Sequence, residues 1–201
     1  MGTWIIEDDY DSEFHFNRKP IAAIQGMAKK TPVIYVGSFS KTIYPALRLG
    51  FMVVPKELID TFRRAKAQHS GETPILTQAI VSDFITEGHS IRHLRKMNLI
   101  YQKQWVHTQY LVRKNLAGLA TPIAESAGMH IALEIESRSD TQLEQAFAKQ
   151  GYGSSAMSSY NLQEGNKVDS ISGLVLGFAC TNGEERESGI RTLREIILKS
   201  R

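Results

Sequence analysis

Three short apolar runs lie within the first 54 residues of the chain. They are Trp4–Ile6, Val33–Gly37 and Phe51–Val54. Each run is continuous and rich in β-branched or aromatic residues, and it does not alternate with polar positions. This pattern is typical of strands that are covered on both faces of a sheet. The sequence therefore predicts three strands that are buried on both faces.

The apolar pattern becomes helical after Pro55. Apolar residues recur at steps of three and four over residues 56–69, 73–88 and 90–116, which indicates three amphipathic helices. Pro74 stands at the start of the second helix and Gly88 at its end, as is common at helix boundaries. The third helix is expected to be the longest of the protein.

A smaller mixed pattern follows Gly118. It predicts strands over 129–136 and 174–178 and helices over 140–150 and 184–198. Strands that alternate with helices indicate an α/β protein. Because the pattern changes near residue 90, we expect one domain over residues 1–90. A long helix and a second, smaller α/β domain are expected over 91–201.

The composition is that of a folded protein without membrane spans. Of the 201 residues, 42% are hydrophobic and only 15 are Gly and 6 are Pro, which excludes collagenous and disordered classes. No apolar run approaches the roughly 20 residues that cross a bilayer. With no signal-like segment at the start and a single cysteine, Cys180, we expect a cytoplasmic protein with no membrane partner.

The net charge of +3 is unevenly distributed. Six basic and no acidic side chains lie between Gly88 and Gly118, so this stretch carries +6 and the remainder carries −3. A basic helix of this kind could bind nucleic acid, a dimer partner or an acidic tail, or could simply be a solvated helix face; the sequence leaves these alternatives open. His89 and His93 have zinc-ligand spacing, but no third ligand accompanies them, and no metal site is predicted.

Cations and hydroxyls flank the second and third predicted strands. Ser38, Ser40 and Lys41 follow the second strand, and Arg48 comes just before the third. Ligands of open α/β sheets lie outside the carboxyl ends of the strands. Hydroxyls and a guanidinium group bind phosphate through hydrogen bonds. The sequence therefore predicts an anion site at this edge.

Asp8 and Tyr10 end the first strand and would reach the same edge of a parallel sheet. A lysine, a carboxylate, a phenol and an anion site together match what pyridoxal 5′-phosphate requires. The lysine forms a Schiff base with the aldehyde, and the carboxylate keeps the pyridine nitrogen protonated. The residue pattern alone is also compatible with a surface lysine and an ion-paired Arg48.

Three motifs resemble the aminotransferase-like domain of MocR-type bacterial regulators. They are IIEDDYDSEF over 5–14, VIYVGSFSKT over 33–42 and PALRLG over 45–50. These regulators of the GntR superfamily join a winged helix-turn-helix DNA-binding domain to a fold-type I domain that binds pyridoxal phosphate. The resemblance continues to LGFA over 176–179 and covers essentially the whole chain.

The resemblance implies an α/β fold of the fold-type I aminotransferase class. The chain would form its C-terminal half, with part of the large-domain sheet in residues 1–90. The long interdomain helix and the small domain would occupy residues 91–201. The implied site residues are Lys41 as the catalytic Schiff-base lysine, Asp8 at the pyridine nitrogen, Tyr10 at the ring hydroxyl, and Ser38, Ser40 and Arg48 at the phosphate.

The function implied by the resemblance is effector sensing in a transcriptional regulator. The domain would bind pyridoxal phosphate and a small amine or amino acid, form a homodimer, and act on DNA through a domain outside this chain. A working aminotransferase and a fragment that binds no cofactor are the alternatives. Against the aminotransferase, Val175 stands where many such enzymes carry an arginine that grips the substrate carboxylate.

Overall fold

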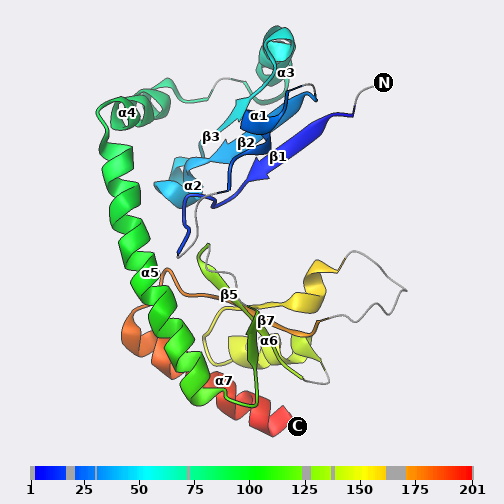
Figure 1. The fold of residues 1–201 in the computed structure, drawn as a ribbon, viewed down its shortest axis with the longest axis vertical. Coiled ribbons are helices and arrows are strands. Elements are labelled where there is room, and N and C mark those ends of the chain that lie inside the picture. The colour runs from blue at the N-terminus through cyan, green and yellow to red at the C-terminus, as the bar shows by residue number, and fades with distance from the viewer. Residues whose placement is uncertain are drawn as a thin grey trace. The chain divides into compact units, whose positions relative to one another are not determined.

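The chain folds into two compact units, Met1–Asn98 and Leu99–Arg201 (Figure 1). The structure is a computed structural model. It describes residues 3–16, 21–29, 31–71, 73–123, 128–136, 139–161 and 171–200. Among the helices of these residues, none is both long and apolar enough to span a membrane.

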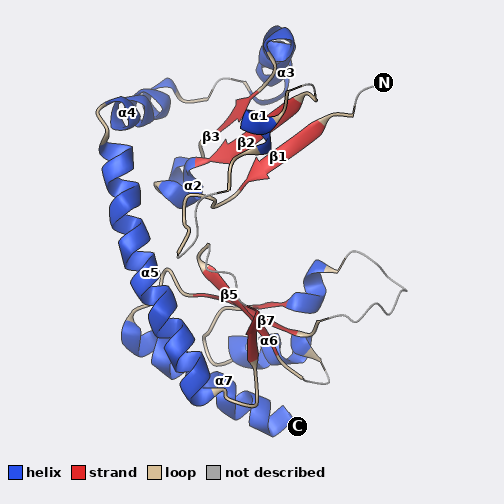
Figure 2. Ribbon diagram, in the orientation of Figure 1, coloured by secondary structure: helices blue, strands red, loops and turns tan. Residues whose placement is uncertain are grey.

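The first unit is built on a three-stranded sheet, which Figure 2 shows in red. The strands are β1 (Ile5–Asp9), β2 (Val33–Ser38) and β3 (Gly50–Val53), in that order. β1 pairs with β2 in parallel, whereas β3 pairs with β2 in the antiparallel sense. The three predicted strands are thus confirmed, and the direction of the third is set by the short connection from β2 to β3.

Helices connect and follow these strands. The short helix α1 (Ile24–Met27) lies between β1 and β2, and α2 (Phe39–Thr42) with the 3-10 helix η1 (Pro45–Leu47) lies between β2 and β3. The 3-10 helix η2 (Lys56–Leu58) leads into α3 (Ile59–Ser70), which is followed by α4 (Ile75–Thr86). The helices predicted over 56–69 and 73–88 are confirmed, whereas α1 and α2 are too short to leave a periodic signal.

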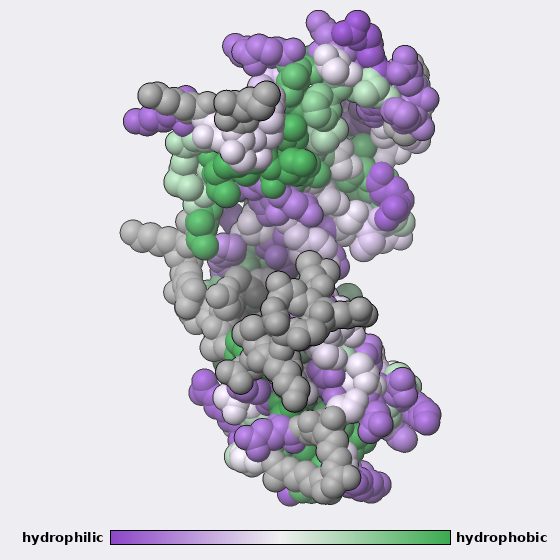
Figure 3. Space-filling view, turned by 90° about the vertical axis from the view of Figure 1, so that its right-hand side faces the viewer, coloured by the Kyte–Doolittle hydropathy of each residue, from purple (hydrophilic) through white to green (hydrophobic). Residues whose placement is uncertain are grey.

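The prediction that all three strands are buried on both faces is wrong for this chain. Every residue of β3 is exposed, and β1 alternates between half-buried and exposed positions. Ile6 is 72% exposed, and Asp8 shares its face because successive side chains of a strand point to opposite faces. Hydrophobic side chains therefore gather on the surface of the first unit (Figure 3).

The longest helix is α5 (His89–Asn115), which confirms the prediction over 90–116. The division between the two units falls inside this helix. All six of its basic side chains are exposed: Arg92, Arg95, Lys96, Lys103, Arg113 and Lys114.

The second unit contains a four-stranded antiparallel sheet in the order β4-β5-β7-β6. Its strands are β4 (Thr121–Ile123), β5 (His130–Glu134), β6 (Ser155–Ala156) and β7 (Gly173–Gly177). The other elements are α6 (Asp140–Ala148), the 3-10 helix η3 (Met157–Tyr160) and α7 (Gly183–Ser200). The predicted β5, α6, β7 and α7 are confirmed. β4 and β6 were not predicted because two or three residues carry no periodicity.

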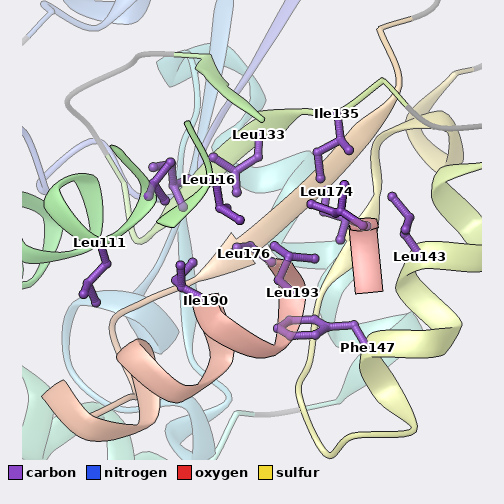
Figure 4. Close-up of a cluster of buried hydrophobic side chains, with 13 residues drawn as sticks. Leu111, Leu116, Leu133, Ile135, Leu143, Phe147, Leu174, Leu176, Ile190 and Leu193 are labelled. Atoms are coloured by element: carbon purple, nitrogen blue, oxygen red, sulfur yellow. The ribbon is translucent and has the colours of Figure 1, made fainter. Parts of the chain in front are cut away.

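A leucine-rich core holds the second unit together (Figure 4). Leu133 of β5 and Leu174 of β7 are fully buried and lie on one face of the sheet, where they meet Leu193 of α7 and Leu143 of α6. Burying one such side chain contributes about 1.5–3 kcal/mol. The core therefore fixes the sheet and its helices as one body.

Candidate functional site

The junction of β2 and α2 brings two hydroxyls and an amine into one helical turn. Ser38 is the last residue of β2 and the N-cap of α2, and its Oγ accepts a hydrogen bond from the Ser40 N–H at 3.1 Å. This cap turns the chain from strand to helix. Because Lys41 comes three residues after the cap, its amine stays at the same edge of the sheet.

Arg48 reaches this edge because β3 runs antiparallel to β2. Ser38 pairs with Gly50 across the two strands, and Phe39 N–H donates to Leu49 O at 3.1 Å. The backbone of Arg48 is left-handed, with φ 49° and ψ 35°. In the described part of the chain it is the one non-glycine residue with positive φ. Such strain in a non-glycine residue is typical of functional sites.

Asp8 and Tyr10 come from the end of β1. Asp8 pairs with Val36 in the parallel register, so it lies on the same face of the sheet as Val36 and Ser38. Tyr10 follows directly after β1, and the Lys41 Nζ lies 5.0 Å from the centroid of the Tyr10 ring. The structure thus brings Lys41 and Tyr10 together, and it places Asp8 on the same face of the sheet as Ser38.

The opposite face of the sheet holds a supporting network. The Tyr35 hydroxyl donates a short hydrogen bond to the Asp9 carboxylate, which also accepts from the backbone N–H and the hydroxyl of Ser12. Burial acts to raise the pKa of Asp9, but the hydrogen bonds from Ser12 and Tyr35 outweigh it and hold this pKa below its ordinary value. Burial, and then the bond to Asp9, raise the pKa of Tyr35.

The sequence pattern alone assigns no role to Asp9. Its role follows from the strand register, because successive side chains of a strand point to opposite faces and Asp9 pairs with Gly37, so that Asp9 shares a face with Tyr35. Asp9 ties the end of β1 to β2. It is therefore a positioning residue for Asp8 and Tyr10 on its two sides.

The charged groups at the edge form no ion pair among the described residues. This holds for Lys41, Arg48 and Asp8, and the Ser38 hydroxyl uses only its acceptor capacity. Two cations without an ion pair, at the same strand end as two hydroxyls, fit a ligand that carries both a phosphate and an amine-reactive group. This donor set fits the cofactor expected from the sequence. In the same part of the chain, no three His, Cys, Asp or Glu side chains are placed to share a metal ion.

Comparison with known proteins assigns the family. Residues 2–167 match the family model of aminotransferase class I and II. The chain belongs to this family. The described edge with Lys41 lies within the matched residues, so the aminotransferase-like fold predicted from the motifs is confirmed.

Two curated relatives of this chain are a regulatory protein and a transaminase. The probable rhizopine catabolism regulatory protein MocR of Rhizobium meliloti is 36% identical over 196 residues, which cover 97% of this chain and 39% of the regulator. The 2-aminoadipate transaminase of Thermus thermophilus is 32% identical over 106 residues, which cover 51% of this chain and 26% of that enzyme.

A solved structure shows the same fold. The α-aminoadipate aminotransferase LysN of Thermus thermophilus, complexed with N-(5′-phosphopyridoxyl)-L-leucine, superposes with a TM-score of 0.84 at 23% identity. The match covers 96% of this chain and 50% of that one. The family member therefore spans about half the length of this aminotransferase and less than half the length of the regulator.

Proposed function

We propose that this chain is the cofactor-binding and effector-sensing part of a bacterial MocR-type transcriptional regulator, with pyridoxal 5′-phosphate held at the edge formed by β1, β2 and α2. The observation that carries the proposal is the grouping of Lys41, Ser38, Ser40 and Arg48 around the end of β2. The 36% identity with the regulator over 97% of this chain supports the regulatory context.

Each residue at the edge has a defined task in this proposal. Arg48 and the hydroxyls of Ser38 and Ser40 would bind the phosphate, and the Lys41 amine would hold the cofactor at its aldehyde group. Asp8 would hold a proton on the pyridine nitrogen, and the Tyr10 hydroxyl would donate to the ring oxygen. When bound, the cofactor supplies an electron sink and an aldehyde that reacts with amines.

The regulatory part of the proposal concerns the longer protein. A small amine or amino acid would compete with Lys41 for the aldehyde, and the change would pass to a winged helix-turn-helix domain outside this chain. The homodimer, the cytoplasmic location and the division into a large-domain part (1–90) and a small domain (91–201) belong to the same proposal. The exposed basic residues of α5 are compatible with contact to DNA or to a partner chain.

Transamination is the second candidate, favoured by the similarity to the 2-aminoadipate transaminase. The second unit argues against an ordinary amino-acid substrate. Val175 of β7 pairs with Ala132 of β5 and with Ser155 of β6. None of these three side chains carries a charge, so position 175 and its two strand neighbours offer no guanidinium group that could clamp a substrate carboxylate.

Borohydride reduction tests the cofactor assignment. The purified chain and the full-length regulator are incubated with pyridoxal phosphate, reduced and digested, and the modified lysine is identified by mass spectrometry. We expect the wild type to carry the phosphopyridoxyl group on Lys41 and Lys41→Ala to carry none. Lys56→Ala is the matched control, because Lys56 is an exposed lysine of the same unit, and it should be labelled like the wild type.

The outcomes separate the candidates. Equal labelling of Lys41→Ala and wild type would overturn the assignment of Lys41 to the cofactor site. If the wild type takes up no cofactor, the chain is better described as a fragment that does not bind pyridoxal phosphate. Enzymes usually turn over about 1–10³ times per second. Turnover of an amino donor with a keto acid at a rate in this range would favour the transaminase.

A further inference from the structure

A cavity in the second unit shares no residue with the Lys41 edge. Its volume is about 370 Å3, which lies within the range of small-molecule sites. Apolar walls come from three elements and two loop positions: Phe147 near the end of α6, Leu176 of β7 and Ile190 of α7, with Tyr152 after α6 and Phe178 after β7.

The aromatic wall of the cavity is built with a particular geometry. The rings of Phe147 and Tyr152 are stacked, with their centroids 5.0 Å apart and their planes 17° apart. The Tyr152 hydroxyl donates to Ser188 Oγ at 2.8 Å. A Cβ atom at Gly189 would lie only 3.2 Å from the Tyr152 ring, so glycine lets this ring lie against α7. The wall is therefore held in place from both sides.

Arg186 of α7 supplies the positive charge of the cavity lining. Its Nη1 donates to the carbonyl oxygens of Phe178 and Thr181 and to the Thr181 hydroxyl. These bonds hold the turn after β7 and use one end of the guanidinium group. The Nε atom is buried and has no hydrogen-bond partner among the described residues, so the guanidinium group is not fully paired within the protein.

The neighbouring carboxylate does not satisfy this donor. Glu185 also lines the cavity, but its Oε2 accepts from Asn182 N–H at 2.8 Å, while Asn182 Oδ1 accepts from Glu185 N–H at 2.9 Å. This reciprocal cap at the start of α7 engages the carboxylate. Burial lowers the pKa of Arg186, and the nearby Glu185 carboxylate opposes this effect only in part. A buried donor without a partner is costly.

We infer that this cavity binds a small organic carboxylate with an apolar or aromatic body. The carboxylate would accept a hydrogen bond from the part of the Arg186 guanidinium that lines the cavity, and the body would lie against the stacked rings of Phe147 and Tyr152. A hydrogen bond between a guanidinium and a carboxylate is charge-assisted and therefore short and strong. The inferred site is separate from the proposed cofactor site, and a negative result at one site would not affect the assignment of the other.

Calorimetric titration of the 201-residue chain tests the inference. The probe is 3-phenylpropionate, and its neutral amide, 3-phenylpropionamide, is the matched control ligand. We expect the acid to bind at least tenfold more tightly than the amide. Arg186→Gln should remove this difference, whereas Arg191→Gln should keep it, because Arg191 is exposed and pairs with Glu187 at 2.6 Å.

A second variant does not depend on the turn that Arg186 holds. Gly153 lines the cavity, and a Cβ atom there would meet no atom within 4 Å. Gly153→Phe should therefore fold normally and weaken binding of 3-phenylpropionate at least tenfold while labelling of Lys41 by pyridoxal phosphate stays unchanged. Equal affinity for acid and amide, undetectable binding of the acid, or unchanged binding in Gly153→Phe would each overturn the inference.

Discussion

The ammonium group of Lys41 lies over the face of the Tyr10 ring, 5.0 Å from its centroid. The two residues are 31 positions apart in the sequence and meet because β1 and β2 run parallel and end at the same edge. A cation over an aromatic face gains about 0.5–1 kcal/mol at exposed sites, and Tyr10 is 53% exposed. Tyr10 therefore orients the amine as well as presenting a phenol.

The two contributions of Tyr10 are separable by substitution. Tyr10→Phe keeps the ring under Lys41 and removes the hydroxyl, whereas Tyr10→Ala removes both. We expect Tyr10→Phe to shift the pH profile of the visible absorption of the bound cofactor. Tyr10→Ala should in addition strengthen pyridoxal phosphate binding by up to about two- to fivefold relative to Tyr10→Phe, because the cation–π contact stabilises the unliganded Lys41 ammonium and is given up when this amine binds the aldehyde. A titration followed by absorbance measures both; identical profiles for Tyr10→Phe and wild type would refute the phenol's role.

Replacing Arg48 should change the free energy of unfolding and the affinity for pyridoxal phosphate in opposite directions. Arg48→Gly removes the guanidinium but suits the left-handed backbone, so the free energy of unfolding should rise by up to about 1 kcal/mol. Pyridoxal phosphate binding should fall by about 10- to 100-fold, because a charge-assisted hydrogen bond contributes about 1.5–3 kcal/mol.

Arg48→Ala is the control for this prediction. It loses the same guanidinium and keeps a Cβ atom in the left-handed conformation, so its cofactor affinity should match that of Arg48→Gly while its stability is lower. Urea denaturation and cofactor titration measure the two quantities. A glycine variant that binds pyridoxal phosphate like the wild type would remove Arg48 from the phosphate site.

The Asp9–Tyr35 bond predicts an acid-sensitive end of the first sheet. Because the folded state lowers the pKa of Asp9, its stabilising effect is complete above the ordinary value of about 3.9 and is lost as the pH falls through the lowered value. Tyr35→Phe should reduce protection of the β1 and β2 amides from hydrogen exchange by about 1–2 kcal/mol near pH 7, in line with loss of a hydrogen bond to a charged group.

The difference between Tyr35→Phe and wild type should shrink below pH 4. Tyr44→Phe is the matched control, since Tyr44 is 60% exposed in the same unit, and it should leave the protection unchanged at every pH. A constant difference between Tyr35→Phe and wild type from pH 7 to pH 3 would contradict the role of the ionised Asp9.

The buried carboxylate of Asp140 should be essential for the stability of the second unit. Asp140 is only 4% exposed and accepts from Ser158 N–H at 2.9 Å, Ser158 Oγ at 2.6 Å and Gly173 N–H at 3.2 Å. Asp140→Ala leaves two backbone donors without their acceptor, so we expect a loss of about 3 kcal/mol in the free energy of unfolding. Ser158→Ala removes one hydroxyl only and should cost about 1 kcal/mol. Urea denaturation compares the two; equal losses would show that the backbone donors find other partners.

The sequence by itself determined the elements with a strong periodic pattern. The apolar runs at β1 and β2 and the steps of three and four along α5 are local properties, and they appear in the structure where the pattern places them. The motifs also identified the family, because they preserve the chemistry of a few residues within continuous segments.

Only the tertiary structure decided which groups meet. The antiparallel direction of β3 carries Arg48 back to Ser38, and the register of β1 against β2 places Asp9 beside Tyr35 and sets Asp8 on the other face. Such contacts join residues that are far apart in the chain, and a shift of one residue in register would exchange the two faces. The charge of Arg186 and the aromatic rings beside its cavity likewise come together only when α6, β7 and α7 pack around one core.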